Sequence, residues 1–114
     1  SLQKRSEERQ LMARIGEWAA DAPDETANLL ELAQIAGVPL RQLQQGFKTY
    51  TGMSPAQWLR LRRLNGARRE LLSTTDTTVA EVAMNWSFWH LGRFSNSYRA
   101  LFQELPSETL KRSS

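Results

Sequence analysis

The sequence predicts an all-α protein, and three observations support this prediction. Apolar residues recur at intervals of three and four along most of the chain, which is the spacing that gives a helix one apolar face. No run alternates apolar and polar residues in a way that demands a strand. Short clusters of Gly, Pro, Asp and Thr separate the periodic segments, as turns do. The chain has 114 residues, so it can bury one modest core.

Composition excludes several classes of protein. The chain contains no cysteine, so neither disulfides nor thiolate chemistry is expected. No unbroken apolar run is long enough for a membrane helix, and no signal-peptide pattern is present. We therefore expect a cytoplasmic protein without membrane contact.

The net charge is unevenly distributed along the chain. Residues 1–36 carry four basic and seven acidic side chains, a net charge of −3, whereas residues 37–114 carry 11 basic and five acidic side chains, a net charge of +6. This concentration of positive charge favours a polyanionic partner. The alternative is an Arg-rich surface that is simply solvated.

Three helices are predicted before a longer central one, over residues 1–20, 26–37 and 39–51. Asp21-Ala22-Pro23-Asp24 ends the first, Gly37 ends the second, and Gly52 ends the third. The residues expected to face the core are Leu11, Ile15 and Trp18, with Leu2 as a candidate lead-in, then Leu29, Leu32, Ala33 and Ala36, then Leu40, Leu43 and Phe47.

The central segment, residues 54–73, predicts one long basic helix. Ser54 can cap this helix, and Pro55 suits its first turn, where a missing N–H costs nothing. Its apolar stripe is Trp58, Leu61, Leu64, Ala67 and Leu71, and its arginines, mostly off the stripe, are Arg60, Arg62, Arg63, Arg68 and Arg69. A helix of this length spans roughly 28 Å.

Three shorter helices are predicted after the central one. Thr77 or Thr78 caps the first, Ser87 lies at a turn, and the second runs from Trp89 or His90 to Phe102. The last covers residues 106–111. The residues expected to face inward are Val79, Val82, Ala83, Leu91, Phe94, Tyr98, and either Leu101 or Phe102.

The two halves of the chain align as an internal repeat. The matched pairs are Ala33 with Ala83, Gly37 with Ser87, Val38 with Phe88, Leu43 with Phe94, Phe47 with Tyr98, Lys48 with Arg99, Pro55 with Pro106 and Leu59 with Leu110. One extra residue enters the second turn. Each half contains two short helices joined by a tight turn, which is the form of a helix-turn-helix. The alternative is chance similarity between two amphipathic hairpins.

The repeat predicts a domain organisation: a first helix-turn-helix over residues 24–53, a linker helix over 54–73, and a second helix-turn-helix over 77–105. Two like units on one rigid helix can present two like helices to successive segments of one DNA groove. The predicted length of the linker helix is comparable with one DNA turn, about 34 Å.

Two stretches of sequence carry a family motif. The first is Gly52-Met53-Ser54-Pro55-x-x-Trp58-Leu59-x-x-x-Arg63-Leu64-x-x-Ala67-Arg68-x-x-Leu71-Leu72, and the second is Val79-Ala80-Glu81-Val82-Ala83 followed by Phe88, Phe94, Tyr98-Arg99, Phe102 and Pro106. Together they resemble the AraC/XylS transcriptional regulators over residues 9–112, although the family usually has Tyr at the position of Trp58. The run of residues 86–94, WSFWHLGRF, resembles a subgroup that includes regulators of ethanolamine utilisation.

This resemblance implies seven helices in two helix-turn-helix subdomains, with recognition helices over residues 39–50 and 90–102. It implies a bacterial transcriptional regulator of the activator type that binds double-stranded DNA in two adjacent major-groove segments and has RNA polymerase as a further partner. Family members usually carry a separate domain, so effector binding and dimerisation are expected to use a domain absent from this chain. No cofactor is expected.

Three departures from the family pattern concern the second unit. Ser87 replaces the usual turn Gly, Gln103 or Glu104 stands where the first unit has Gly52, and Asn96 stands where many members have Arg. These departures put the base preference of the second unit in doubt, but not the fold.

The side chains expected to contact bases carry hydrogen-bonding groups on the outward helix faces. Arg41 can pair with guanine, Gln44 or Gln45 with adenine or a mixed step, and in the second unit Arg93 and Asn96 have the same capacity. Ser95 is shorter and more permissive, and Gly92 allows close approach of the backbone. The expected phosphate contacts are Lys48, Arg99, Arg60 and Arg62, together with N–H groups at helix starts.

Each of these interpretations has a plainer alternative. An exposed Gln is usually only solvated, and phosphate contact competes with base contact for Arg41 and Arg93. Arg63 and Arg68 could instead pair with Glu70 or with the acidic first helix. Trp89 has two interpretations: it packs on the turn, or it contacts a sugar or a thymine methyl.

Two other classes of function compete with DNA binding. An enzyme is disfavoured because His90 is the only histidine and no Gly-rich phosphate loop appears, so no catalytic residue and no metal ligand is predicted. A helical protein–protein interaction bundle would explain the helices and tryptophans. It would not explain basic, polar outward faces at equivalent places in a repeat.

Overall fold

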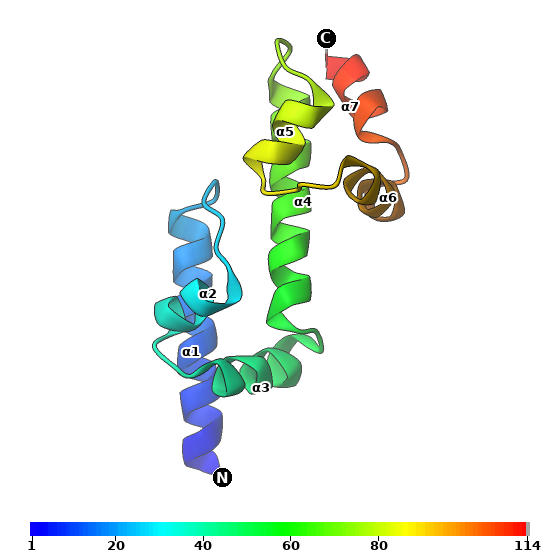
Figure 1. Cartoon of the computed structure of the whole chain (residues 1–114). Helices are drawn as coiled ribbons and strands as arrows, with labels where there is room; N and C mark the ends of the chain where they lie inside the picture. The colour runs from blue at the N-terminus through cyan, green and yellow to red at the C-terminus, as the bar shows by residue number, and fades with distance from the viewer. Residues whose placement is uncertain (114) are drawn as a thin grey trace. The chain divides into compact units, whose positions relative to one another are not determined.

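The structure is a computed structural model that describes residues 1–113 and consists, over these residues, of seven α-helices without a strand (Figure 1). The helices are α1 (Leu2–Asp21), α2 (Leu29–Ala36), α3 (Leu40–Thr51), α4 (Pro55–Ser73), α5 (Val79–Asn85), α6 (Leu91–Phe102) and α7 (Pro106–Ser113). The all-α prediction is confirmed.

The chain divides into two compact units, Ser1–Arg60 and Leu61–Ser114. The boundary lies inside α4, so this helix contributes its first turns to unit 1 and its remaining turns to unit 2. The start of α4 is fixed by a reciprocal pair of hydrogen bonds. The Gln57 N–H donates to Ser54 Oγ at 3.1 Å, and the Ser54 N–H donates to Gln57 Oε1 at 3.0 Å. Ser54 therefore caps α4, as predicted.

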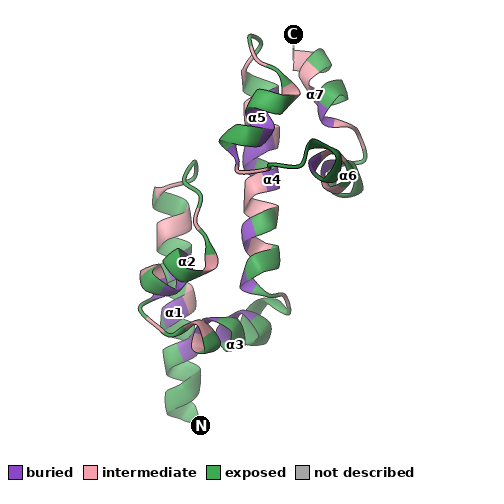
Figure 2. Cartoon of the chain, viewed as in Figure 1, coloured by how far each residue is buried: buried purple, intermediate pink, exposed green. Residues whose placement is uncertain are grey.

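Unit 1 is built from α1, α2, α3 and the first turns of α4, and α1 contacts both α2 and α3. Its core consists of apolar residues at helical spacing (Figure 2): Leu11, Ile15, Leu32, Ala33, Ala36, Leu43, Phe47 and Leu59. Trp58 packs on this core, with its ring 5.5 Å from that of Phe47. The suggested extension of the α1 stripe to Leu2 is wrong, because this side chain is 84% exposed.

Helix α2 begins later than the predicted residue 26. Asn28 forms a capping box with Glu31: the Glu31 N–H donates to Asn28 Oδ1 at 2.8 Å, and the Asn28 N–H donates to Glu31 Oε1 at 3.1 Å. These bonds satisfy two otherwise free N–H groups, so Leu29 becomes the first helical residue.

Unit 2 places residues of α4 against α5, α6 and α7. Its core cluster is Leu64, Ala67, Leu71, Val82, Ala83, Trp86, Phe94 and Tyr98, with Val79, Phe88, Phe102 and Leu110 packed against it. Thr78 caps α5 by accepting the Glu81 N–H at 3.1 Å.

One inward prediction in α6 is wrong. Leu91 is 47% exposed, because it is the first residue of the helix and the buried residues of α6 begin one turn later, at Phe94. Of the two alternatives at the other end of α6, Phe102 packs on the core, while Leu101 is 39% exposed.

The turn that follows α2 has the same hydrogen bonds as the turn that follows α5. After α2, Gly37 has φ 71°, and the Val38 N–H donates to the Ala33 carbonyl at 3.1 Å. After α5, Ser87 has φ 63°, and the Phe88 N–H donates to the Ala83 carbonyl at 2.8 Å. Ser87 therefore adopts the left-handed conformation that Gly37 adopts more easily.

The turn that closes each second helix is also alike in the two units. Gly52 has φ 73°, and its N–H donates to the Lys48 carbonyl. Gln103 has φ 63°, and its N–H donates to the Arg99 carbonyl. Gln103 therefore takes the place of Gly52 in the same backbone conformation.

Candidate nucleic-acid interface

Helices α3 and α6 are equivalent in length and in both ends. Each has 12 residues and ends before a left-handed cap residue; α3 begins three residues after the left-handed Gly37, and α6 begins four residues after the left-handed Ser87. Every position of α6 therefore corresponds to the position 51 residues earlier in α3.

The outward face of α3 carries four of the predicted contact residues. Arg41, Gln44, Gln45 and Lys48 are all exposed. Their spacing of three, four and seven residues places them on one stripe, opposite the buried Leu43 and Phe47. Side chains that can read bases and a side chain that can neutralise a phosphate therefore share one solvent-facing surface.

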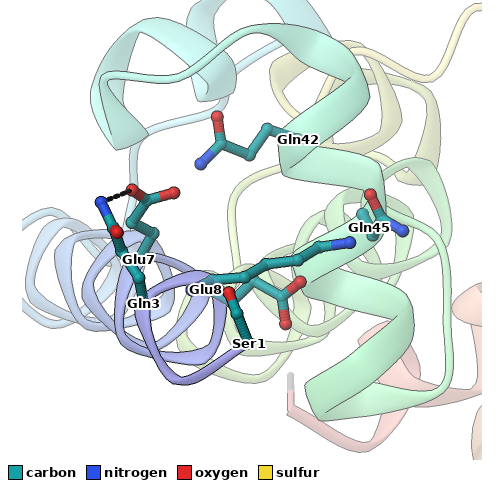
Figure 3. A pocket seen from close by; sticks show the side chains of 7 residues that line it. Ser1, Gln3, Glu7, Glu8, Gln42 and Gln45 are labelled. Atoms are coloured by element: carbon teal, nitrogen blue, oxygen red, sulfur yellow. Dashed lines mark hydrogen bonds between the residues drawn. The ribbon is translucent and has the colours of Figure 1, made fainter.

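Gln45 lies at the edge of this stripe nearest α1. With Gln42 it forms the α3 side of an open hollow of about 350 Å³, whose other side consists of Ser1, Gln3, Lys4, Glu7 and Glu8 (Figure 3). Gln45 thus borders a hollow that contains Lys4 as well as the carboxylates of Glu7 and Glu8, whereas Gln44 does not line the hollow.

The outward face of α6 repeats this pattern with different side chains. Ser95, Asn96 and Arg99 correspond to Gln44, Gln45 and Lys48 respectively. Asn96 and Arg99 are exposed, and Ser95 is half-buried.

Arg93 does not correspond to Arg41. The position equivalent to Arg41 is Gly92, and Arg93 corresponds to Gln42, on the neighbouring flank of the helix. Arg93 is exposed, so it lies beside the stripe of α6 rather than at its first position.

The arginines of α4 differ in their surroundings. Arg60 is exposed and Arg62 is half-buried, and each already has an interaction within the chain. Arg63 Nη1 donates to the Ser87 carbonyl at 3.0 Å, and its guanidinium lies 4.7 Å from the centre of the Phe88 ring. Arg68 lies 4.8 Å from the centre of the Phe102 ring. The contacts of Arg63 and Arg68 described above lie inside unit 2, so both side chains contribute to its stability.

Unit 1 has a counterpart of the Arg63 contact. Arg14 Nη1 donates to the Ala36 carbonyl, the last of α2, at 2.7 Å. An arginine from the preceding long helix thus satisfies a carbonyl at the helix-turn-helix turn in each unit. Sequence reasoning missed Arg14, because its spacing from the turn carries no local signal.

The first turns of α3 and α6 differ from those of four other helices. Ser1, Asn28, Ser54 and Thr78 provide side-chain caps for α1, α2, α4 and α5. Pro39 and His90, at the starts of α3 and α6, make no such hydrogen bond. The N–H groups at these two helix starts are therefore available to an anion.

Trp89 is the extra residue of the second turn. This residue is 71% exposed, so most of its surface is not packed on the turn. It lies next to His90, the residue at the start of α6.

Within residues 1–113, no group of three or more His, Cys, Asp or Glu side chains is placed to hold a metal ion. None of the helices described is both long and apolar enough to cross a bilayer.

Comparison with known proteins assigns the family. A family model described as "Helix-turn-helix domain" matches residues 32–112. The crystal structure of a probable AraC family transcriptional regulator from Rhodopseudomonas palustris is similar, with a TM-score of 0.77 and 30% identity over 90% of this chain and 96% of that one. The chain belongs to the AraC family.

Other relatives of this AraC-family chain are named as regulators. It is 35% identical over 99 residues to "XylDLEGF operon transcriptional activator 2" of Pseudomonas putida, covering 85% of this chain and 63% of that protein. It is 39% identical over 87 residues to "Probable thc operon regulatory protein" of Rhodococcus erythropolis, covering 72% of this chain and 26% of that protein. The chain thus spans less than two thirds of these relatives.

One similar structure was solved with DNA. The DNA-binding domain of AdpA, described as a global transcriptional factor and crystallised in complex with a target DNA, has a TM-score of 0.71 and 28% identity over 90% of this AraC-family chain and 91% of that one.

Proposed function

We propose that this AraC-family chain binds double-stranded DNA with sequence preference, with α3 and α6 each entering one of two adjacent major-groove segments. The observation that carries the proposal is the repeated stripe on two equivalent helices: Gln44, Gln45 and Lys48 on α3, and Ser95, Asn96 and Arg99 on α6. Each stripe combines amide or hydroxyl groups with one terminal cation, the combination that base reading and phosphate binding require.

The proposed contact residues divide into two roles. The proposed base contacts are Arg41, Gln44, Gln45, Arg93, Ser95 and Asn96. The proposed phosphate contacts are Lys48, Arg99, Arg60 and Arg62, together with the uncapped N–H groups at the starts of α3 and α6. Gln44 is the stronger candidate of the two glutamines, because Gln45 borders the hollow beside α1, whereas Gln44 does not line it.

The test begins with selection of preferred sites from random duplexes, followed by affinity measurements on variants. Replacing Arg41 or Gln44 with Ala removes base-edge hydrogen bonds, so the preference in one half of the site should relax, at a cost of about 1–3 kcal/mol per good contact. Gln10→Ala, an exposed change on α1, is the matched control and should leave the preference unchanged. Retention of the full preference by both α3 variants would contradict the assigned face.

Phosphate contacts are tested by the dependence of affinity on salt. Lys48→Ala and Arg99→Ala should weaken binding to all sequences alike, and each should reduce the slope of log K against log salt by about 0.9. A helical interaction bundle, the rival function, predicts no steep salt dependence for the parent chain. An equally shallow slope for the parent and both variants would therefore favour the rival.

Further properties of the whole protein belong to the same proposal. We infer a non-enzymatic bacterial transcriptional regulator at the nucleoid in the cytoplasm, with RNA polymerase as a partner and with effector binding and dimerisation in another domain. The relatives named as activators and operon regulators support this inference. A complex of the chain, its selected DNA site and RNA polymerase should migrate more slowly in a gel than the binary complex with DNA.

The subgroup is a finer proposal. Residues 86–94, WSFWHLGRF, support a place among regulators similar to those of ethanolamine utilisation. Footprinting on promoters of ethanolamine-utilisation genes, with unrelated promoters as controls, tests it. Equal protection of both sets would contradict the subgroup.

A further inference from the structure

Two equivalent positions hold the recognition helix of each unit by different interactions. In unit 1, the Phe47 and Trp58 rings lie 5.5 Å apart, an apolar contact between α3 and the start of α4. The residues 51 positions later are Tyr98 in α6 and Thr109 in α7. Both are completely buried, and the Tyr98 hydroxyl donates to Thr109 Oγ1 at 2.7 Å.

This bond is the middle of a longer chain of interactions, which we call the Tyr98 network: Arg68, Tyr98, Thr109, Glu104 and Arg112. Arg68 Nη1 approaches the Tyr98 hydroxyl at 3.4 Å, a long hydrogen bond. At the other end, the Thr109 hydroxyl donates to Glu104 Oε2. Glu104 Oε1 lies 3.0 Å from Arg112 Nη1. The network thus connects α4, α6, the turn after α6, and α7.

The chemistry of the end groups fixes the direction of every bond. A guanidinium can only donate, and a carboxylate can only accept. The two hydroxyls therefore each accept one bond from the Arg68 side and donate one towards Glu104. Neither hydroxyl has a spare proton for a different partner.

Such a network resists displacement more than an apolar contact does. Rotation or sliding of α6 would leave the Tyr98 or Thr109 hydroxyl buried without a partner, which is unfavourable because the hydroxyl has lost water and gains no other hydrogen bond. A contact between apolar surfaces, in contrast, leaves no polar group unpaired when it shifts. Tyr98 directly precedes Arg99 and follows Asn96 by two residues, so the anchored position is within one turn of both outward-facing residues.

We propose that the Tyr98 network positions α6 for base reading, so that Thr109 and Tyr98 are positioning residues for the second half of the DNA site. This inference rests on the proposed DNA-binding function. Base preference in the half-site of α6 depends on the network, whereas preference in the half-site of α3 does not.

A pair of near-isosteric substitutions tests the proposal. Thr109→Val exchanges the hydroxyl for a methyl group, and Thr109→Ser keeps the hydroxyl but removes the methyl group. Affinity is measured for two sets of duplexes, one varied only in the α3 half-site and one only in the α6 half-site, with the halves assigned by the Gln44→Ala variant.

The expected result is specific to one half. Thr109→Val should reduce discrimination among α6 half-sites about three- to tenfold and leave discrimination among α3 half-sites unchanged. Thr109→Ser should behave as the parent chain in both sets. Tyr98→Phe, which removes the link to Arg68 and keeps the Thr109–Glu104 bond, should act in the same direction as Thr109→Val.

Two results would overturn the proposal. One is an equal loss of discrimination in both halves, which indicates general destabilisation. The other is a lower melting temperature for Thr109→Val with discrimination unchanged, which indicates a merely structural role. If the parent chain shows no base preference at all, the proposed function fails instead. Amide exchange then tests the network separately: faster exchange in α6 but not in α3 supports positioning, and equal exchange refutes it.

Discussion

Gly66 shows how a neighbour distant in sequence can restrict the residue type that fits at one position. A Cβ atom built at Gly66 would lie 2.3 Å from Cη2 and Cζ3 of Trp86. The Trp86 ring is itself buried, at 6% exposure, in the core cluster of unit 2. The ring therefore packs directly on the backbone of α4, and no larger residue fits without displacing it.

The expected effect of Gly66→Ala is a loss of about 1–3 kcal/mol in the free energy of unfolding, because a buried ring must move. Gly16→Ala is the matched control, since Gly16 is exposed in α1 with no atom near the added Cβ. That change should instead stabilise by about 0.5–1 kcal/mol through helix propensity. Urea denaturation of both variants measures the difference, and equal values would contradict the packing argument.

At the scale of elements, the turns at the ends of the short helices have the same backbone geometry in the two units but different residue types. Gly37 and Gly52 take positive φ in unit 1, and Ser87 and Gln103 take it in unit 2. This conformation is unfavourable by about 1–2 kcal/mol for a residue with a Cβ. Unit 2 therefore carries backbone strain at two turns that unit 1 avoids.

Ser87→Gly should consequently raise the melting temperature of unit 2. The free energy of unfolding should rise by up to about 1 kcal/mol, since relief of the left-handed strain is partly offset by the greater freedom of Gly in the unfolded chain. The Arg63 bond to the carbonyl of residue 87 is a backbone contact and is retained. Gly37→Ser is the reciprocal control and should destabilise. A loss of stability in Ser87→Gly would show that the Ser side chain contributes more than the strain costs.

At the scale of the whole molecule, α4 is one unbroken helix of 19 residues to which both units contribute. A continuous helix resists bending more than a flexible linker does. We therefore expect one spacing between the two half-sites to be strongly preferred. Inserting half a helical turn of DNA, about five base pairs, between the half-sites should lower affinity at constant salt, because the second half-site then faces another side of the duplex. Equal binding at all spacings would mean that the units engage DNA independently.

Much of the fold could be predicted from local sequence. The periods of three and four predicted the helices, and Gly37, Gly52 and Ser54 marked turns and a cap, because these signals act over a few residues. Boundaries were less accurate at α2, where the Asn28–Glu31 capping box sets the start. The outward residues of α3 could also be predicted, since one helical period is enough to place them on a common face.

The contacts between distant residues required the tertiary structure. Arg63 and Arg68 could not be assigned from spacing alone, and the structure directs them to Ser87 and Tyr98. Thr109 gave no signal, because a single Thr in a polar segment has no period. Helical periodicity states which residues share a face, whereas only the packing of separate helices decides what that face meets. The sequence by itself therefore determined the helices and their exposed stripes, and the tertiary structure decided which buried groups hold each recognition helix.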